Sequence, residues 1–301
     1  MRTEMKTERA NAKINLYLNV VGRRENGYHD IVSIMQTVSL CDIVTLQYHE
    51  GTHFSVRLSA SGNDSMPTDC RNLAWRAVEL YLGAIGQSGE VTISIEKHIP
   101  MAAGLAGGSA DAAAVLRALN ALCNNRLSLS ELCDLGAKLG ADIPFCIVGG
   151  GALVEGIGER LTEIAPMPQC ALVVACMGDG VSTPWGYGKL DELHGNFANL
   201  QTADDPRAAR IADAMKNGAI LDTCSDFYNI FEEVVPEVQP YVNKIKSVMN
   251  ENGALRAMMS GSGPSVFGVF ETVEAAMVAC EQLKKRGANA FVCHPRPKYK
   301  I

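Results

Sequence analysis

The sequence has no long hydrophobic run and few aromatic residues. Its 301 residues are 47% hydrophobic but only 6% aromatic. No apolar stretch approaches the roughly 18 residues that a helix needs to cross a bilayer, and the charged residues 1–9 lack the apolar core of a secretion signal. These absences predict a soluble, cytoplasmic protein with no membrane partner.

An excess of basic residues is also missing. Lysine and arginine number 27 against 33 acidic residues, which gives a formal net charge of −6. Because proteins that bind nucleic acid usually carry a basic face, this balance argues against a nucleic-acid partner. The 10 cysteines form no Cys-x-x-Cys pair and no Cys/His spacing typical of a metal site. We expect reduced thiols without a catalytic role.

What the sequence does contain is a glycine-rich stretch at residues 100–114 that runs directly into an apolar helical pattern. Gly104, Gly107 and Gly108 would let the backbone adopt positive φ and approach a ligand closely. The helix expected from Ser109 would direct its free N–H groups at the loop. The stretch is neither a Walker A sequence nor Gly-x-Gly-x-x-Gly. It predicts an anion cradle for phosphate, with a tight turn that packs a helix on a sheet as the alternative.

Polar groups also lie beside predicted strands. An alternating segment places Lys13 and Asn15 on one face of a half-buried strand. Asp142 lies between a helix-ending glycine and a proline, on a connection that we expect a buried strand at 145–154 to follow. A second glycine-rich loop, at 259–264, leads into another strand. None of these segments is diagnostic alone.

The hydrophobic periodicity predicts an α+β protein in two parts. Strands are expected at 14–21, 43–48, 54–59, 91–96, 145–154, 171–176 and 290–294, and helices at 73–82, 109–122, 128–140, 206–216, 238–250 and 273–286. Because the pattern restarts after residue 158, we expect an N-terminal domain over 1–158 with a mixed sheet and helices. The C-terminal domain, over 159–301, should hold an antiparallel sheet with helices on one face. The cleft between them is the expected active site.

In their order and separations, the Lys13 strand, the 100–114 loop and the 260–263 loop resemble the three motifs of the GHMP family of small-molecule kinases. The resemblance covers nearly the whole chain. It implies the two-domain GHMP kinase fold with a ferredoxin-like C-terminal domain, and ATP with a magnesium ion as the cofactor.

Within that family, the segments 27–29 and 140–144 are similar to those of members that phosphorylate a cytidine-diphosphate alcohol in non-mevalonate isoprenoid biosynthesis. The implied partner is therefore a small-molecule cytidine-diphosphate substrate. A kinase of homoserine or mevalonate is one alternative. A non-catalytic nucleotide-binding regulator on the same fold is another.

The resemblance also implies roles for single residues. Asp142 would accept or orient the proton of the acceptor hydroxyl, with a cap of the turn as its alternative. Lys13 would keep that carboxylate ionised and neutralise charge on the phosphoryl group, with a solvated edge-strand lysine as its alternative. The implied ATP cradle comprises Pro100, Met101, Ala102, Ala103, Gly104, Leu105, Ala106, Gly107, Gly108 and Ser109.

Two of the implied nucleotide contacts have structural alternatives. Ser109 is the one local hydroxyl for phosphate or magnesium, and it is equally suited to be a helix N-cap. Asn72 and Lys97 match positions that approach the nucleotide base, although Asn72 is also a plausible N-cap.

For the acceptor, the resemblance implies a cytosine stacked between Tyr28 and Tyr187, with His29 bonding the edge of the base and Asn15 nearby. Trp185 is a rival of Tyr187 for the stacking role. A packed surface turn is the alternative for the Tyr28-His29 pair.

Overall fold

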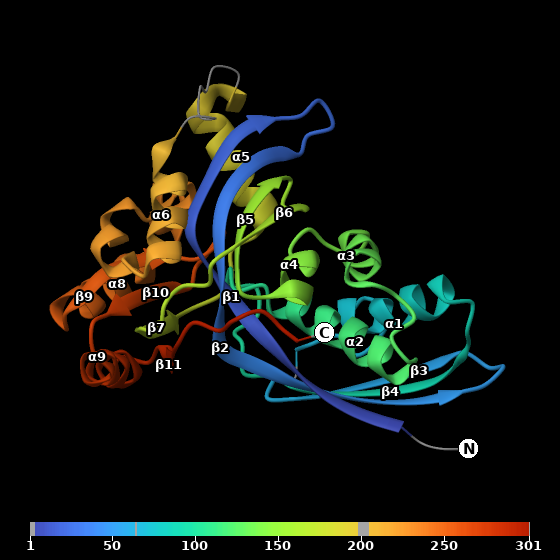
Figure 1. Cartoon of the computed structure of the whole chain (residues 1–301). Helices are drawn as coiled ribbons and strands as arrows, with labels where there is room; N and C mark the ends of the chain where they lie inside the picture. The colour runs from blue at the N-terminus through green and yellow to red at the C-terminus, as the bar shows by residue number, and fades with distance from the viewer. Residues whose placement is uncertain (1–3, 64, 198–204, 301) are drawn as a thin grey trace.

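Two long antiparallel strands form the spine of the molecule (Figure 1). The computed structural model describes residues 4–63, 65–197 and 205–300. Its larger sheet has the order β3-β4-β2-β1-β8, with β5 paired to β2 and β6 to β5. The strands are β1 (Glu4–Arg23), β2 (His29–Glu50), β3 (Ser55–Ser61), β4 (Gly89–Glu96), β5 (Gly151–Gly156), β6 (Arg160–Ile164) and β8 (Tyr228–Asn229).

The central part of β1 is buried on both faces, so the expectation of a half-buried strand is wrong. Every residue from 10 to 20 is buried. Ala10 packs in the helix-covered core of the larger sheet, whereas Leu18 and Val20 pack toward the smaller sheet. The polar residues between them are therefore taken out of water, and each needs a hydrogen-bond partner inside the protein.

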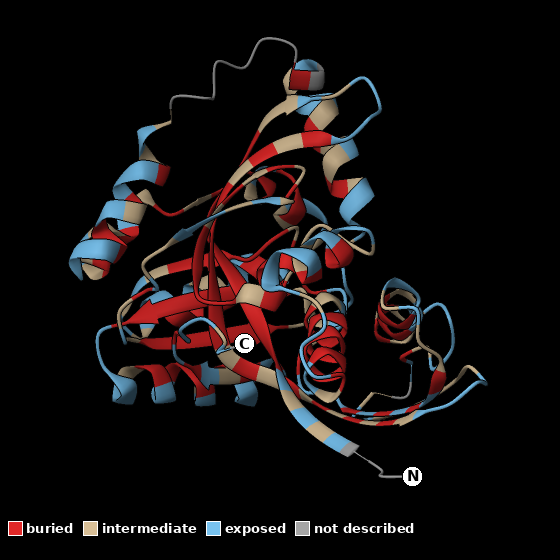
Figure 2. Ribbon diagram, turned by 45° about the vertical axis from the view of Figure 1, so that its right-hand side comes forward, coloured by how far each residue is buried: buried red, intermediate tan, exposed pale blue. Residues whose placement is uncertain are grey.

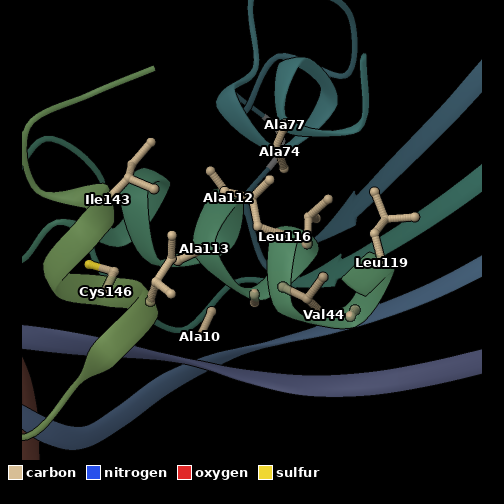
Figure 3. Packing of buried hydrophobic residues seen from close by; sticks show 14 of the residues in the cluster. Ala10, Val44, Ala74, Ala77, Ala112, Ala113, Leu116, Leu119, Ile143 and Cys146 are labelled. Carbon is tan, nitrogen blue, oxygen red and sulfur yellow. The ribbon is translucent and has the colours of Figure 1, made fainter. Parts of the chain in front are cut away.

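Four helices cover one face of the larger sheet (Figure 1). They are α1 (Leu73–Ala84), α2 (Gly107–Leu122), α3 (Leu129–Ala137) and α4 (Ile143–Val148). Residues 110–120 of α2 are buried all round, as expected of a helix enclosed by its neighbours. Its small side chains Ala112 and Ala113 lie among those of α1, α4 and β1 (Figure 3). α3 begins with a capping box formed by Ser128 and Glu131.

The strand expected at 145–154 is wrong, because α4 occupies its first half and β5 begins only at Gly151. Pro144 in the first turn favours a helix start. Packing on α3 then stabilises the helix, since a Cβ at Gly136 would lie 2.7 Å from Ile143 Cγ2 and glycine leaves that space free. Tertiary contact therefore overrides the strand propensity of the apolar run.

The second half of the chain builds an antiparallel sheet of order β11-β7-β10-β9, and the predicted architecture is confirmed. Its outer face is covered by α8 and α9, and its inner face packs toward β1 (Figure 2). The strands are β7 (Ala171–Cys176), β9 (Ala254–Met259), β10 (Val266–Phe270) and β11 (Asn289–Cys293). The helices are α5 (Thr183–His194), α6 (Pro206–Asn217), α7 (Val235–Val238), α8 (Tyr241–Glu251) and α9 (Val273–Lys285), with short 3₁₀ turns at Gly195–Phe197, Ile220–Asp226 and Ile230–Glu233.

The chain crosses between the two sheets more than once. β6, just beyond residue 158, still pairs with β5 in the larger sheet. Near the C-terminus, Pro295 pairs with Val38, and Lys298 pairs with Gly149. The boundary at 158/159 stays a prediction. Within the described ranges, no helix combines the length and apolarity needed to span a membrane.

Leu116 tests the core of the larger half. It is fully buried between α1 and the sheet (Figure 3). Leu116→Ala should lower the free energy of unfolding by about 2–5 kcal/mol, because the cavity it leaves cannot collapse completely. Chemical denaturation measures this loss. Leu193→Ala, at an exposed position of α5, should change stability by about 0.5 kcal/mol or less. Equal losses for the two variants would contradict this packing.

Candidate active site

A cleft of about 1160 Å³ is lined by residues from both halves of the chain. Its walls come from β1, the 100–109 loop, the starts of α4 and α5, and the 261–262 loop. Most predicted site residues line it: Lys13, Asn15, Tyr28, His29, Ala102, Ala103, Gly104, Ala106, Gly107, Gly108, Ser109, Asp142 and Tyr187. The predicted residues Asn72, Lys97, Pro100, Met101 and Leu105 lie outside this lining, as does Trp185.

The glycine-rich loop adopts positive φ at Gly104, as predicted, but its other two such positions are alanines. Ala102 has φ 50°, Gly104 has φ 79° and Ala106 has φ 57°. Gly107 and Gly108 instead belong to α2, which begins two residues earlier than predicted. Left-handed alanines cost roughly 1–3 kcal/mol each and are concentrated at functional sites. The loop therefore stores backbone strain that neighbouring contacts must hold.

Gly104 is the position where the loop meets the second glycine-rich loop. A Cβ there would overlap the carbonyl oxygen of Ser260, so only glycine fits. The Ser260 hydroxyl donates to the Gly104 carbonyl at 3.1 Å. On the other side, the Lys13 N–H donates to the Leu105 carbonyl at 3.2 Å. These contacts clamp the strained loop between β1 and the 260–263 loop.

The start of α2 presents an open surface to the cleft. A Cβ added at Gly108 would meet only Leu73 Cδ1, at 3.9 Å. The first turn of a helix leaves its N–H groups without intrahelical partners, and these groups attract anions. Ala106 occupies the N-cap position, so the N-cap alternative for Ser109 is wrong. Within the described structure the Ser109 hydroxyl has no hydrogen-bond partner, and it lines the cleft.

Asn15 joins β1 to the second glycine-rich loop. Its Oδ1 accepts a hydrogen bond from Lys13 Nζ at 2.7 Å and another from the Gly261 N–H at 3.0 Å. Its Nδ2 donates to Ser33 Oγ at 2.8 Å. Asn15 is only 1% exposed. Its side chain therefore holds the site together from within, and its predicted contact with the substrate stays a prediction.

Lys13 and Asp142 line the same cleft from different elements. The Lys13 side chain lies in the buried part of β1, with the residue 4% exposed. Asp142 lies at the N-cap position of α4 but makes no capping bond, so its structural alternative is wrong. Its carboxylate makes no hydrogen bond or ion pair with any described residue, Lys13 included. The cleft thus holds a carboxylate available to a ligand.

The aromatic residues are arranged differently from the expected sandwich. His29 itself stacks on Tyr187, with ring centroids 4.5 Å apart and planes 14° from parallel. Tyr28 is 58% exposed. One face of the Tyr187 ring is therefore covered by His29, and the predicted contact of His29 with the edge of a base stays a prediction. Trp185 packs on the core beneath the smaller sheet and is not in the cleft lining.

Sequence reasoning missed α5 and, with it, Asp191. His29 Nε2 lies 2.7 Å from Asp191 Oδ1. Tyr187 and Asp191 are four residues apart on α5, and this spacing places two side chains on one helix face. The signal was present in the sequence as Pro184 followed by Gly195, which mark the start and end of the helix.

Lys97 and Asn72 have structural roles, and their predicted nucleotide contacts stay predictions. Lys97 Nζ contacts the carboxylate of Asp42 and lies 2.7 Å from Asp111 Oδ2. A Cβ at Gly107 would lie 3.5 Å from the same ammonium, so this buried triad lies directly beneath the loop. Asn72 caps α1, accepting from the Ala74 N–H at 2.8 Å, and its N-cap alternative is confirmed.

Burial makes Asp111 sensitive to pH. Loss of hydration raises the pKa of Asp111 to about 7, although Lys97 opposes the shift. One of its carboxylate oxygens is buried with no partner among the described residues. From about pH 4 to 7 the folded state therefore holds a proton that the unfolded state has released.

Asp111→Asn should remove this dependence. Because the folded-state pKa is raised, the stability of the natural protein relative to the variant should fall as pH rises from about 4 through 7. Urea denaturation of both proteins at several pH values measures the difference. Asp134→Asn, at an exposed position of α3, is the control. A difference between natural protein and Asp111→Asn that stays constant with pH would contradict the assignment.

Comparison with known proteins gives consistent matches. The models for the GHMP kinases N terminal domain and the GHMP kinases C terminal match residues 72–150 and 202–289. A Caldicellulosiruptor bescii protein named 4-diphosphocytidyl-2-C-methyl-D-erythritol kinase is 40% identical over 92% of this chain and 93% of its own. A Clostridium botulinum protein of the same name is 39% identical over 94% of this chain and 98% of its own.

Solved structures of kinases superpose on the whole chain. A crystal structure of 4-(cytidine 5'-diphospho)-2C-methyl-D-erythritol kinase has a TM-score of 0.78 and 33% identity, covering 96% of this chain and 99% of its own. A homoserine kinase from Cytophaga hutchinsonii has a TM-score of 0.73 and 19% identity, covering 99% and 96%. The second likeness bears on the fold alone.

Proposed function

This chain belongs to the GHMP kinase family of small-molecule kinases, and we propose that it transfers the γ-phosphoryl group of ATP to the 2-hydroxyl of 4-diphosphocytidyl-2-C-methyl-D-erythritol. The observation that carries the proposal is that one cleft brings together the N-terminus of α2, the unpaired carboxylate of Asp142, the buried ammonium of Lys13 and the stacked pair of His29 and Tyr187. The names of relatives about 40% identical support this acceptor.

The nucleotide end of the proposed site is the start of α2. The open surface at Gly108 leaves room for phosphate oxygens beside the free N–H groups of the first turn. The described residues contain no cluster of three or more acidic, His or Cys side chains that could hold a metal ion. Magnesium commonly binds through substrate phosphates and water, so the site fits an ion that arrives with ATP, with Ser109 as the side-chain hydroxyl at the cradle. Magnesium would neutralise phosphate charge.

The reacting end is formed by Asp142 and Lys13. Transfer makes a bond between the acceptor oxygen and the γ-phosphorus and breaks the bond to the β-phosphate, while the hydroxyl proton needs an acceptor. The unpaired carboxylate of Asp142 is suited to take that proton. The ammonium of Lys13, held by Asn15, would offset negative charge that gathers on the transferring group.

The acceptor end is the aromatic corner around His29. The exposed ring of Tyr28 offers a face on which a base can stack. Tyr187 supports His29 from behind, so its proposed role passes through that imidazole. A homoserine or mevalonate kinase would have no need of a base-reading corner. A non-catalytic regulator would have no need of an unpaired carboxylate beside the phosphate cradle.

A panel of acceptors tests the proposal. ADP release should be observed with 4-diphosphocytidyl-2-C-methyl-D-erythritol and be near background with homoserine and with mevalonate. Faster turnover of either simple alcohol would overturn the proposed acceptor. ADP binding without turnover of any acceptor would favour the regulator.

The proton acceptor is tested by Asp142→Asn. The amide keeps the shape of the side chain but cannot take a proton, so kcat should fall by about 10²-fold or more while KM values change little. Steady-state kinetics measure the effect. Asp134→Asn, at an exposed position of α3, should leave kcat unchanged. Near-normal kcat in Asp142→Asn would rule out this residue as the base.

The cradle is tested by Gly108→Val. The added side chain enters open cleft instead of packed protein, so the fold should persist while affinity for ADP falls by roughly tenfold or more. Calorimetric titration measures that affinity. Gly83→Val controls for replacing a helical glycine. Gly83 lies at an exposed position of α1, where an added Cβ meets no atom within 4 Å. Unchanged ADP affinity in Gly108→Val would show that phosphate binds elsewhere.

A further inference from the structure

The imidazole of His29 is held on one side by a carboxylate. Its Nε2 lies 2.7 Å from Asp191 Oδ1, and both residues line the cleft. A carboxylate can only accept a hydrogen bond. In the neutral ring the proton must therefore lie on Nε2, which leaves Nδ1 as an acceptor.

The rest of the surroundings keep this arrangement in place. Arg23 Nε lies 3.5 Å from Asp191 Oδ2, so the carboxylate is anchored at its second oxygen. Tyr187 covers one face of the imidazole, and Phe197 packs against it edge-on with ring centroids 5.7 Å apart. Both Tyr187 and Asp191 come from α5, so one helix fixes both the plane and the tautomer of the ring.

The second ring nitrogen is available to a ligand. His29 Nδ1 has no hydrogen-bond partner in the part of the chain that the structure describes. It is also absent from the fully buried side-chain atoms that lack a partner in this same part, so it keeps some exposed surface, and His29 lines the cleft. An unpaired acceptor at the wall of a cleft selects a ligand that offers an N–H or O–H.

We propose that Asp191 is a specificity-determining positioning residue: by fixing His29 with Nδ1 unprotonated, it makes the acceptor site prefer cytosine to uracil. This inference rests on the proposed function. Cytosine carries an exocyclic amine that can donate to Nδ1. Uracil carries a carbonyl at the same position, and two acceptors facing each other leave both unpaired at a desolvated contact.

Asp191→Asn tests the inference because an amide can donate as well as accept. The variant permits the tautomer with the proton on Nδ1, which could donate a hydrogen bond to the uracil carbonyl. The ratio of kcat/KM for the cytidine acceptor over its uridine analogue should fall roughly tenfold or more. The change should reside mainly in KM, since Asp191 does not touch the reacting atoms.

The tautomer itself gives an independent readout. In protein labelled with ¹⁵N-histidine, a two-bond proton–nitrogen correlation spectrum should show His29 protonated at Nε2 and unprotonated at Nδ1, with the signal identified by its loss in His29→Gln. Asp191→Asn should shift the ring toward the other tautomer, and Asp191→Glu should retain the original one. Glu192→Gln, the adjacent exposed position on α5, should change neither the tautomer nor the ratio.

Two results would overturn the inference while leaving the proposed function standing. One is a natural protein with a proton on Nδ1, which needs no variant to detect. The other is an Asp191→Asn variant that folds and keeps both the tautomer and the discrimination. Absence of turnover with either acceptor in the natural protein would overturn the proposed function and this inference with it, so wild-type activity distinguishes the two failures.

Discussion

The side-chain amide of Asn15 is the junction on which the rest of the site depends. It accepts from the Lys13 ammonium and from the backbone of Gly261, and it donates to Ser33 on the neighbouring strand. These bonds are buried, where an unpaired partner would cost more than in water. These bonds fix the spine of the larger sheet, the Lys13 ammonium and the 260–263 loop relative to one another.

The glycine-rich loop at 100–109 depends on that junction because its backbone is strained. Left-handed Ala102 and Ala106 do not persist without support, and the support comes from contacts with Ser260 and β1. The buried triad of Lys97, Asp42 and Asp111 holds the loop from beneath. An arrangement fixed before a ligand arrives loses little freedom on binding, which is the physical advantage of building a phosphoryl-transfer site in this way.

Sequence patterns predicted the two sheets, most helices and some of the wall residues of the cleft, because these follow from periodicity and from a recognisable order of motifs. They failed where long-range packing decides whether a residue is buried or which secondary structure a segment adopts. The alternation of β1 indicated one wet face, but every residue from 10 to 20 is buried. The apolar run after Asp142 has the pattern of a strand. It forms a helix because Gly136 leaves space for that helix to pack on α3. The partners of Lys97 and His29 lie far away in sequence, so neither pairing leaves a local signal.

The central claim is that this cleft joins the γ-phosphoryl group to one hydroxyl of a cytidine-diphosphate alcohol. The most direct measurement is the ³¹P NMR spectrum of a reaction of the protein with ATP, magnesium and 4-diphosphocytidyl-2-C-methyl-D-erythritol. The account predicts a new phosphomonoester signal that is coupled to the carbon bearing the 2-hydroxyl. The diphosphate signals of the acceptor should persist. Inorganic phosphate as the main new product, or a phosphate attached elsewhere on the acceptor, would contradict it.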